Sequence, residues 1–154
     1  MHDLYRNGAV AADLAAPSKK ALFAALGQMA ERAHGIDAGL VVDTLTERER
    51  LGSTGFGGGV AIPHGKIEHL PHVVGVFARL AQPLEYDAVD GLPVDLVYML
   101  LSPTDSGAGH LKALASVSRK LRDRACVAKL RNASNEDALV ALLSAEGECD
   151  RDAA

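Results

Sequence analysis

Two apolar runs of strand length constrain the fold of this chain more than any other feature of its sequence. Val73 to Leu80 reads VVGVFARL, and Val94 to Leu101 reads VDLVYMLL with an interruption at Asp95. Both runs are rich in β-branched or aromatic residues, which favour strands. Near-continuous apolarity is typical of strands in a sheet that is covered on both faces. The two runs therefore predict strands inside such a sheet.

Helical periodicity precedes these runs. Ser18 is placed to cap a helix that begins at Lys19 and ends at Gly35, and Asp37 is placed to cap a second helix that runs to about Arg50. The inward stripes predicted for the two helices are Leu22, Leu26, Met29 and Ala33, and then Val41, Leu45, Arg48 and Leu51.

Helical patterns also follow the strands. A third helix is predicted from His110, and a fourth after Ser134, with Asp137 placed for a capping box. Because helices precede, interrupt and follow the strands, we expect an α/β chain, a three-layer α/β/α domain with a mixed β-sheet flanked by helices. A length of 154 residues and an apolar fraction of 48% suit a single domain over 1–154, with its core at about 15–144 and frayed ends.

Composition argues against several classes of function. The net charge is -4, from 16 basic and 20 acidic residues, and no region has the basic excess that nucleic-acid binding requires. No apolar stretch approaches the roughly 20 residues of a membrane span, and the N-terminus does not resemble a secretion signal. Cys126 and Cys149 are predicted to be free thiols, which suits a reducing compartment. We expect a soluble, cytoplasmic protein without nucleic-acid partners.

Arg48 needs an explanation because the residues in phase with it are apolar. One interpretation is that its guanidinium points into the domain, where the planar fork can pair with two phosphate oxygens. The alternative is an arginine that extends along the helix end toward water. Glu47, Glu49 and Arg50 lie off the stripe and are expected to be solvated.

His64 is the strongest candidate for chemistry. It follows the short apolar run VAI and Pro63, so we expect it at a strand terminus. A neutral imidazole keeps a free lone pair near neutral pH and can attack phosphorus. The phosphoramidate that forms is a good phosphoryl donor, which suits a carrier. A structural or merely exposed histidine is the alternative when His64 is considered alone.

A glycine-rich stretch and a second histidine are candidates for anion binding. The residues assigned to a phosphate-binding loop are Ser53, Thr54, Gly57, Gly58 and Gly59. Glycine leaves backbone N–H groups uncovered and hydroxyls add donors, although glycine clusters are also ordinary turns. His110 opens a predicted helix, where the dipole favours anions, so a phosphoryl group between His64 and His110 would be stabilised.

Two other kinds of site fit less well. His64, His69 and His72 are separated by 5 and 3 residues, which matches no zinc-binding pattern, and Gly65 and Pro71 interrupt the helix that such a site would use. The chain also has no GxSxG motif and no cysteine beside the glycine-rich stretch, as a hydrolase of those classes would need. We expect no metal and no cofactor.

Apolar residues around His64 are candidates for contact with a partner protein. Phe56, Ile67 and Leu70 flank His64 in predicted loops, where burial in the core is not assured. Core packing of all three is the alternative, with about equal weight.

The segment from Arg48 to Leu70, RERLGSTGFGGGVAIPHGKIEHL, resembles the signature of phosphotransferase-system IIA domains of the fructose and mannitol class. SKKALFAAL from Ser18, DGLPVDLVYMLLSP from Asp90 and GHLKALASVSRKLRD from Gly109 resemble, in order and spacing, further parts of the nitrogen-regulatory members of that class. The resemblance covers about Ala15 to Leu143.

This resemblance implies that His64 is phosphorylated on Nε2 and that Arg48 and His110 flank the phosphoryl group. It also implies a donor, a small phosphohistidine carrier similar to the HPr protein of the nitrogen branch, which a phosphoenolpyruvate-dependent enzyme I charges. Gly58 stands where the family usually has a polar residue such as Asn, and Gly109 where an acidic residue often precedes the second histidine. These departures affect the orientation of His110 and leave the nucleophile in place.

The resemblance and the residues together lead us to expect a regulatory phosphocarrier of the nitrogen branch, because the sequence includes no IIB or IIC segment. A sugar-specific IIA component that passes phosphate to a IIB domain is the alternative within the same chemistry. Both would be phosphotransferases. A different class of function is a regulator of a kinase or an ion transporter that acts by binding, independently of phosphate.

Overall fold

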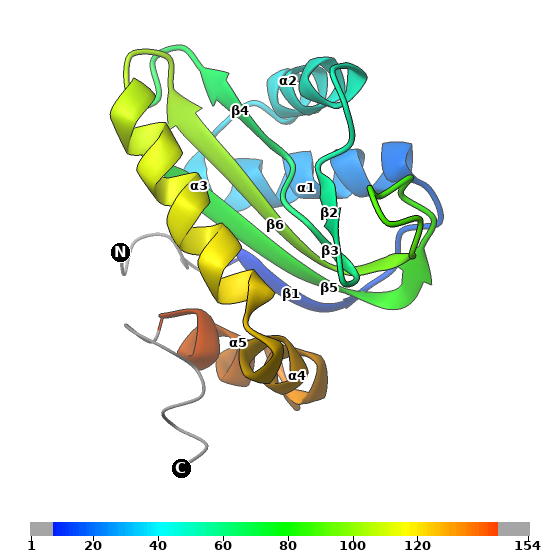
Figure 1. The fold of residues 1–154 in the computed structure, drawn as a ribbon. Coiled ribbons are helices and arrows are strands. Elements are labelled where there is room, and N and C mark those ends of the chain that lie inside the picture. Colours follow the sequence, from blue (N-terminus) through cyan, green and yellow to red (C-terminus); the bar gives the residue numbers. More distant parts are fainter. Residues whose placement is uncertain (1–7, 145–154) are drawn as a thin grey trace.

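The computed structural model describes residues 8–144, which form a six-stranded sheet with helices on both of its faces (Figure 1). The strands are β1 Val10–Leu14, β2 Gly55–Gly57, β3 Val60–Ala61, β4 His64–Ile67, β5 Val74–Leu84 and β6 Val94–Pro103. Their order is β1-β5-β6-β3-β2, and β4 also pairs with β6. β5 and β6 are antiparallel, whereas β1 is parallel to β5, and β3 and β4 are parallel to β6. The sheet is therefore mixed, as the sequence predicts.

Five helices flank this sheet within residues 8–144. They are α1 Lys19–His34, α2 Ala38–Arg50, α3 Gly107–Arg122, α4 Arg124–Asn132 and α5 Glu136–Ser144. α1 and α2 pack on one face of the sheet, and α3, α4 and α5 pack on the other (Figure 1). Alternate residues of β6 enter the two cores, with Val97, Met99 and Leu101 on the first side and Leu96, Tyr98 and Leu100 on the second. The three-layer α/β/α prediction is confirmed.

The caps of the first two helices are those that the sequence predicts. The Ser18 side chain accepts a hydrogen bond from the N–H of Ala21, and the Asp37 side chain accepts one from the N–H of Leu40. Gly35 ends α1 in the left-handed conformation, with φ of 71°. These local signals are sufficient because a cap involves only residues within one turn.

Four elements are not predicted by the sequence: β1, β2, β4 and α4. β2 and β4 lie in segments that were expected to be loops, and His64 begins β4 instead of following the end of a strand. β1 lies before the expected start of the core near residue 15, and it joins the sheet by pairing Val10 with Phe77 of β5. This short segment becomes a strand only through that distant partner. α4 has nine residues, too few for a clear period, and begins where the Asp123 side chain accepts from the N–H groups of Ala125 and Cys126.

Two helix starts differ from the prediction by one to three residues. α3 begins at Gly107 rather than at His110, because small residues in its first turn give a weak helical signal. The cap of α5 is Asn135, whose side chain accepts from the N–H of Ala138, rather than Ser134. Asn and Ser are about equally good N-caps, so residue type alone does not decide whether Ser134 or Asn135 caps the helix.

The cysteine prediction is corrected by the structure. Cys126 is disulfide-bonded, so the prediction of a free thiol is wrong for this residue. The distance between two thiols cannot be read from their spacing in a sequence. Cys149 and the tail that was expected to fray lie outside the described residues. No helix within residues 8–144 is both long and apolar enough to cross a membrane.

Close packing of α1 against α2 fixes the position of the α2 helix, which carries Arg48. A Cβ atom on Gly27 of α1 would lie 2.8 Å from the carbonyl oxygen of Ala38 and 3.3 Å from a methyl carbon of Val42. Glycine is needed at this position because the α2 backbone leaves no room for a side chain.

Replacing Gly27 by Ala should therefore destabilise the protein by about 1–3 kcal/mol, although alanine has the better helix propensity. Gly107→Ala in α3 is the matched control, because no atom lies within 4 Å of the added Cβ, and it should not destabilise the protein. Urea unfolding followed by circular dichroism measures both. A Gly27→Ala protein as stable as the wild type would contradict this account of the α1–α2 contact.

Candidate functional site

Three elements bring the predicted active residues together. Arg48 lies in the last turn of α2, His64 is the first residue of β4, and His110 lies in the first turn of α3. β4 runs parallel to β6 and pairs His64 with Leu100, close to the end of β6 from which the chain enters α3. The register of the sheet thus places residues that are distant in sequence at one site.

The two ring nitrogens of His64 have different partners. Nδ1 lies 2.7 Å from the carbonyl oxygen of Ile62. A carbonyl oxygen only accepts, so Nδ1 carries the proton and Nε2 keeps its lone pair. The Nε–H of Arg48 donates to this Nε2 across 3.3 Å. His64 therefore presents an unprotonated Nε2 to the guanidinium group of Arg48.

The surroundings of His64 favour its neutral form. Burial lowers the pKa of His64 from its ordinary value, and the positive charge of Arg48 lowers this pKa as well. The Ile62 carbonyl and the negative charge of Glu49 act in the opposite direction without reversing the shift. The imidazole is therefore unprotonated on Nε2 at neutral pH, which is the form that can attack an electrophile.

Arg48 is oriented by the backbone that follows its own helix. Its Nη1 donates to the carbonyl oxygen of Gly52 across 2.9 Å, while its Nε donates to His64. Of the two interpretations of this arginine, the structure supports the one in which the side chain turns toward the domain.

His110 lies beside His64 and is buried. The two ring centroids are 5.6 Å apart and the ring planes are inclined by 49°. Nδ1 of His110 lies 2.6 Å from the hydroxyl oxygen of Ser102 in β6. Burial lowers the pKa of His110, and the neighbouring charges of His64 and Lys66 lower it further. A hydroxyl can donate or accept this hydrogen bond. When the Ser102 hydroxyl donates to Nδ1, the proton of the neutral His110 ring lies on Nε2, where it can be donated in turn.

Ser102 is a site residue that sequence reasoning misses. Its side chain is fully buried at the end of β6. The one available signal is a hydroxyl residue between the apolar run VDLVYMLL and Pro103, where a buried polar group needs a partner.

Comparison with known proteins identifies the family. Residues 3–146 match the family described as "Phosphoenolpyruvate-dependent sugar phosphotransferase system, EIIA 2". The chain belongs to this EIIA family.

Several relatives extend this result. A nitrogen regulatory protein of Bradyrhizobium diazoefficiens is 42% identical over 142 residues, which cover 92% of this chain and 93% of that protein. A fructose-specific EIIA component of Haloferax volcanii is 35% identical over 115 residues, which cover 71% of this chain and 75% of that protein. The crystal structure of the nitrogen regulatory protein IIA-Ntr from Neisseria meningitidis superposes with a TM-score of 0.87 at 34% identity, over 93% of this chain and 98% of that one.

The glycines assigned to a phosphate loop lie away from His64 in this EIIA domain. The carbonyl oxygen of Gly59 accepts from the N–H groups of Asp95 and Leu96, whereas that of Pro63 accepts from the N–H of Leu100. Leu100 lies four residues along the extended strand from Leu96, a distance of about 13 Å. The prediction that this glycine stretch cradles the phosphoryl group is corrected accordingly.

Protein groups occupy the glycine stretch instead. The N–H of Gly58 donates to the Asp90 carboxylate, and the carbonyl of Gly58 accepts from the Arg131 guanidinium, which also pairs with Asp95. The segment 55–61 is the β2–β3 hairpin, so the ordinary turn is the correct interpretation of this stretch. Gly57 is the last residue of β2, and Gly58 and Gly59 form the turn of that hairpin.

The side chains of Ser53 and Thr54, the two hydroxyl residues before the hairpin, also form hydrogen bonds within the protein. The Ser53 side chain accepts from the N–H of Gly55. The Thr54 hydroxyl is buried and donates to the Glu49 carboxylate across 2.7 Å. The expectation that Glu49 is solvated is wrong, because its side chain is only 9% exposed and forms an ion pair with Lys19.

The three residues expected to contact a partner differ in exposure. Ile67 is 4% exposed and belongs to the core between the sheet and α1–α2, so it offers almost no surface. Leu70 is half-buried against the same core. Phe56 is half-buried, and its ring lies 5.4 Å from the guanidinium carbon of Arg122.

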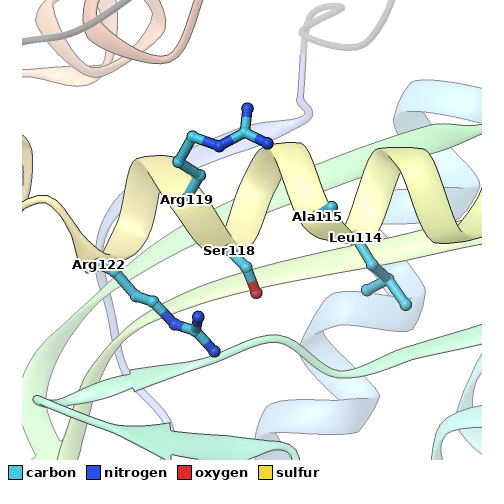
Figure 2. Close-up of a pocket in the computed structure, with 5 residues that line it drawn as sticks. All are labelled: Leu114, Ala115, Ser118, Arg119 and Arg122. Atoms are coloured by element: carbon cyan, nitrogen blue, oxygen red, sulfur yellow. The ribbon is translucent and has the colours of Figure 1, made fainter.

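Exposed apolar side chains near the site lie at the end of α2 and on α3. The prediction that Leu51 belongs to the inward stripe of α2 is wrong, because this residue caps the helix and is 84% exposed. Leu111, the residue after His110, is 68% exposed. A pocket farther along this helix is lined by Leu114, Ala115, Ser118, Arg119 and Arg122 (Figure 2). Figure 2 shows Leu114, Ser118 and Arg122 projecting from the same side of α3, and Arg119 from the opposite side.

His64, His69 and His72, the histidines considered for a metal site, belong to no group of metal-binding side chains within the described residues. The side chain of His69 is 95% exposed. Among residues 8–144, no group of three or more His, Cys, Asp or Glu side chains is arranged to hold a metal ion.

The neutral state of His64 can be tested by nitrogen-15 NMR. At pH 7 the ring should be in the Nδ1–H form, and it should titrate below pH 6.5 because burial and Arg48 oppose the charge. Since the folded pKa is lowered, the unfolded chain binds the proton more readily, so stability should fall as the pH drops through 6.5 toward the folded pKa. A titration midpoint above 6.5, or an Nε2–H ring, would contradict this assignment.

Proposed function

We propose that this EIIA domain is a regulatory phosphocarrier of the nitrogen branch, which accepts a phosphoryl group on Nε2 of His64. One observation carries the proposal: Nδ1 of His64 is bound to the Ile62 carbonyl, and Nε2 faces Arg48 with its lone pair free of a proton. The family match and the 42% identity to a nitrogen regulatory protein support the assignment to this branch.

Transfer in this mechanism is a displacement at phosphorus. The bond between the donor histidine nitrogen and phosphorus breaks as the bond between Nε2 of His64 and phosphorus forms, and the proton on Nδ1 stays in place. The Ile62 carbonyl stabilises the positive charge that develops on the ring. Arg48 must release Nε2 before attack, and its fork then pairs with phosphoryl oxygens. Nε2–H of His110 is the second donor to these oxygens, so no metal or cofactor is required.

The donor in this proposal is an HPr-like phosphohistidine carrier of the nitrogen branch, charged by enzyme I from phosphoenolpyruvate. Its apolar docking surface would contact Leu111, Leu114 and the exposed part of Phe56, which lie on or beside α3. Leu70 stays at the margin of this surface and Ile67 is left out because of its burial. The protein would act in the cytoplasm, where that phosphorelay operates.

A sugar-specific role is the second candidate within the same chemistry. The 35% identity to a fructose-specific EIIA component favours it, although the identity and coverage are lower than for the nitrogen regulatory relative. Rapid transfer from phosphorylated His64 to a IIB domain would support this candidate. A third candidate is a regulator of a kinase or ion transporter that acts by binding alone, and regulation that persists in His64→Ala would support that one.

Incubation with phosphoenolpyruvate, enzyme I and the HPr-like donor should add one phosphate to the wild-type protein. The phosphate should be lost in acid and kept in base, because a protonated phosphoramidate nitrogen is a good leaving group. Intact-mass spectrometry measures the addition, and His64→Ala should remain unmodified. His69→Ala is the matched control, since that side chain is exposed, and it should be modified normally. An acid-stable phosphate would refute the carrier proposal.

His110→Ala should still be phosphorylated, but more slowly, because His64 keeps its own lone pair. Loss of one charge-assisted hydrogen bond of roughly 1.5–3 kcal/mol in the transition state corresponds to about ten- to a hundred-fold in rate. Rapid-quench transfer kinetics would measure the effect. Complete loss of labelling in a folded variant would make His110 a carrier or an essential base, and an unchanged rate would remove it from the mechanism.

A further inference from the structure

A buried carboxylate lies next to the phosphorylation site on α2. Both oxygens of Glu49 accept hydrogen bonds: Lys19 Nζ donates to Oε2 across 2.9 Å, and the Thr54 hydroxyl donates to Oε1 across 2.7 Å. The N–H of Thr54 lies 3.3 and 3.2 Å from the two oxygens, and the Tyr86 hydroxyl lies 3.5 Å from Oε1. A negative charge so close to a site for an anion needs a reason, because it opposes phosphate binding.

The carboxylate anchors the segment on which Arg48 depends. The backbone carbonyl of Glu49 accepts from the N–H of Gly52, and its side chain accepts from the N–H and hydroxyl of Thr54. Glu49 therefore binds Gly52 and Thr54 on either side of Ser53. The Gly52 carbonyl is the acceptor that orients Nη1 of Arg48, whose Nε points at His64.

We propose that Glu49 is a positioning residue for phosphoryl transfer, which holds segment 52–54 so that the Gly52 carbonyl aims Arg48 at Nε2 of His64. Lys19 and Tyr86 complete the anchor, because Lys19 neutralises the carboxylate and its ammonium lies 4.2 Å from the centre of the Tyr86 ring. The inference rests on the proposed function of His64, but its first test requires no phosphorylation.

The pKa of His64 distinguishes positioning from a simple charge effect. Arg48 lowers this pKa, and Glu49 raises it by a smaller amount. If Glu49 contributed only its charge, Glu49→Gln would lower the pKa of His64. If Glu49 holds Arg48 in place, the same variant lets the guanidinium move away from His64. The lowering of the His64 pKa by Arg48, which is the larger of the two effects, is then lost, so the pKa of His64 should rise. Glutamine weakens the anchor, because it removes the charge that pairs with Lys19 and turns one of the two acceptor oxygens into a donor.

The experiment is an NMR titration of His64 in Glu49→Gln, with Glu47→Gln as the matched control. Glu47 lies on the same helix, and its side chain is 69% exposed and pairs with Arg50. We expect a raised pKa for Glu49→Gln and no change for the control. A lowered or unchanged pKa in folded Glu49→Gln would overturn the proposal. If that variant does not fold, Thr54→Val should raise the pKa and Thr54→Ser should restore it, and equal values for these two would overturn the proposal.

Transfer kinetics provide the second test. Glu49→Gln should slow phosphorylation of His64 by up to about a hundred-fold, which is what a displacement of a catalytic group by roughly 1 Å can cost. In an Arg48→Ala background, Glu49→Gln should cause little further loss, because both changes remove the same interaction. Additive losses would overturn the proposal. Absence of phosphorylation in the wild type would instead refute the carrier function. The titration of His64 would still test whether Glu49 positions Arg48, because it requires no phosphorylation.

Discussion

The hydrogen bond between Nδ1 of His64 and the Ile62 carbonyl determines what the rest of the site can do. It fixes the proton on one ring nitrogen, and so leaves the lone pair of the other toward Arg48 and His110. The acceptor lies two residues before the histidine, so the backbone conformation around Pro63 sets the ring orientation. Arg48 and His110 therefore lie beside a ring whose protonation is decided by this local contact.

Strand β6 is the element that assembles this site. It pairs with β3, β4 and β5, and both of its faces are buried, one against α1 and α2 and the other against α3 to α5. The pairing of His64 with Leu100 places the nucleophile near the end of β6, from which the chain passes through Ser102 into α3. A strand buried on both sides cannot slip in register without disrupting both cores. The positions of His64 and His110 therefore depend on the same packing as the stability of the domain.

Adjacent residues at the end of α2 have opposite charges and different tasks. Arg48 turns toward His64, while Glu49 turns toward Lys19 and Thr54. Both side chains are partly removed from water, where an unpaired charge would be costly, and each is satisfied by several partners. In the proposed transfer, this arrangement places a positive group beside the phosphoryl oxygens, while the negative group stays bound to segment 52–54.

The sequence by itself determined the elements whose signals are local. Caps at Ser18, Asp37 and Gly35, the two apolar strands, and the glycine-rich approach to a Pro-His pair each depend on neighbours in the chain. Helical periodicity also singled out Arg48, because the sequence alone shows a charged residue in phase with apolar ones. Only the tertiary structure decided which polar groups meet: it moved Gly57 to Gly59 away from His64, buried Glu49, and brought Ser102 to His110. Those outcomes depend on strand register and on side-chain partners distant in sequence, which the local sequence pattern does not specify.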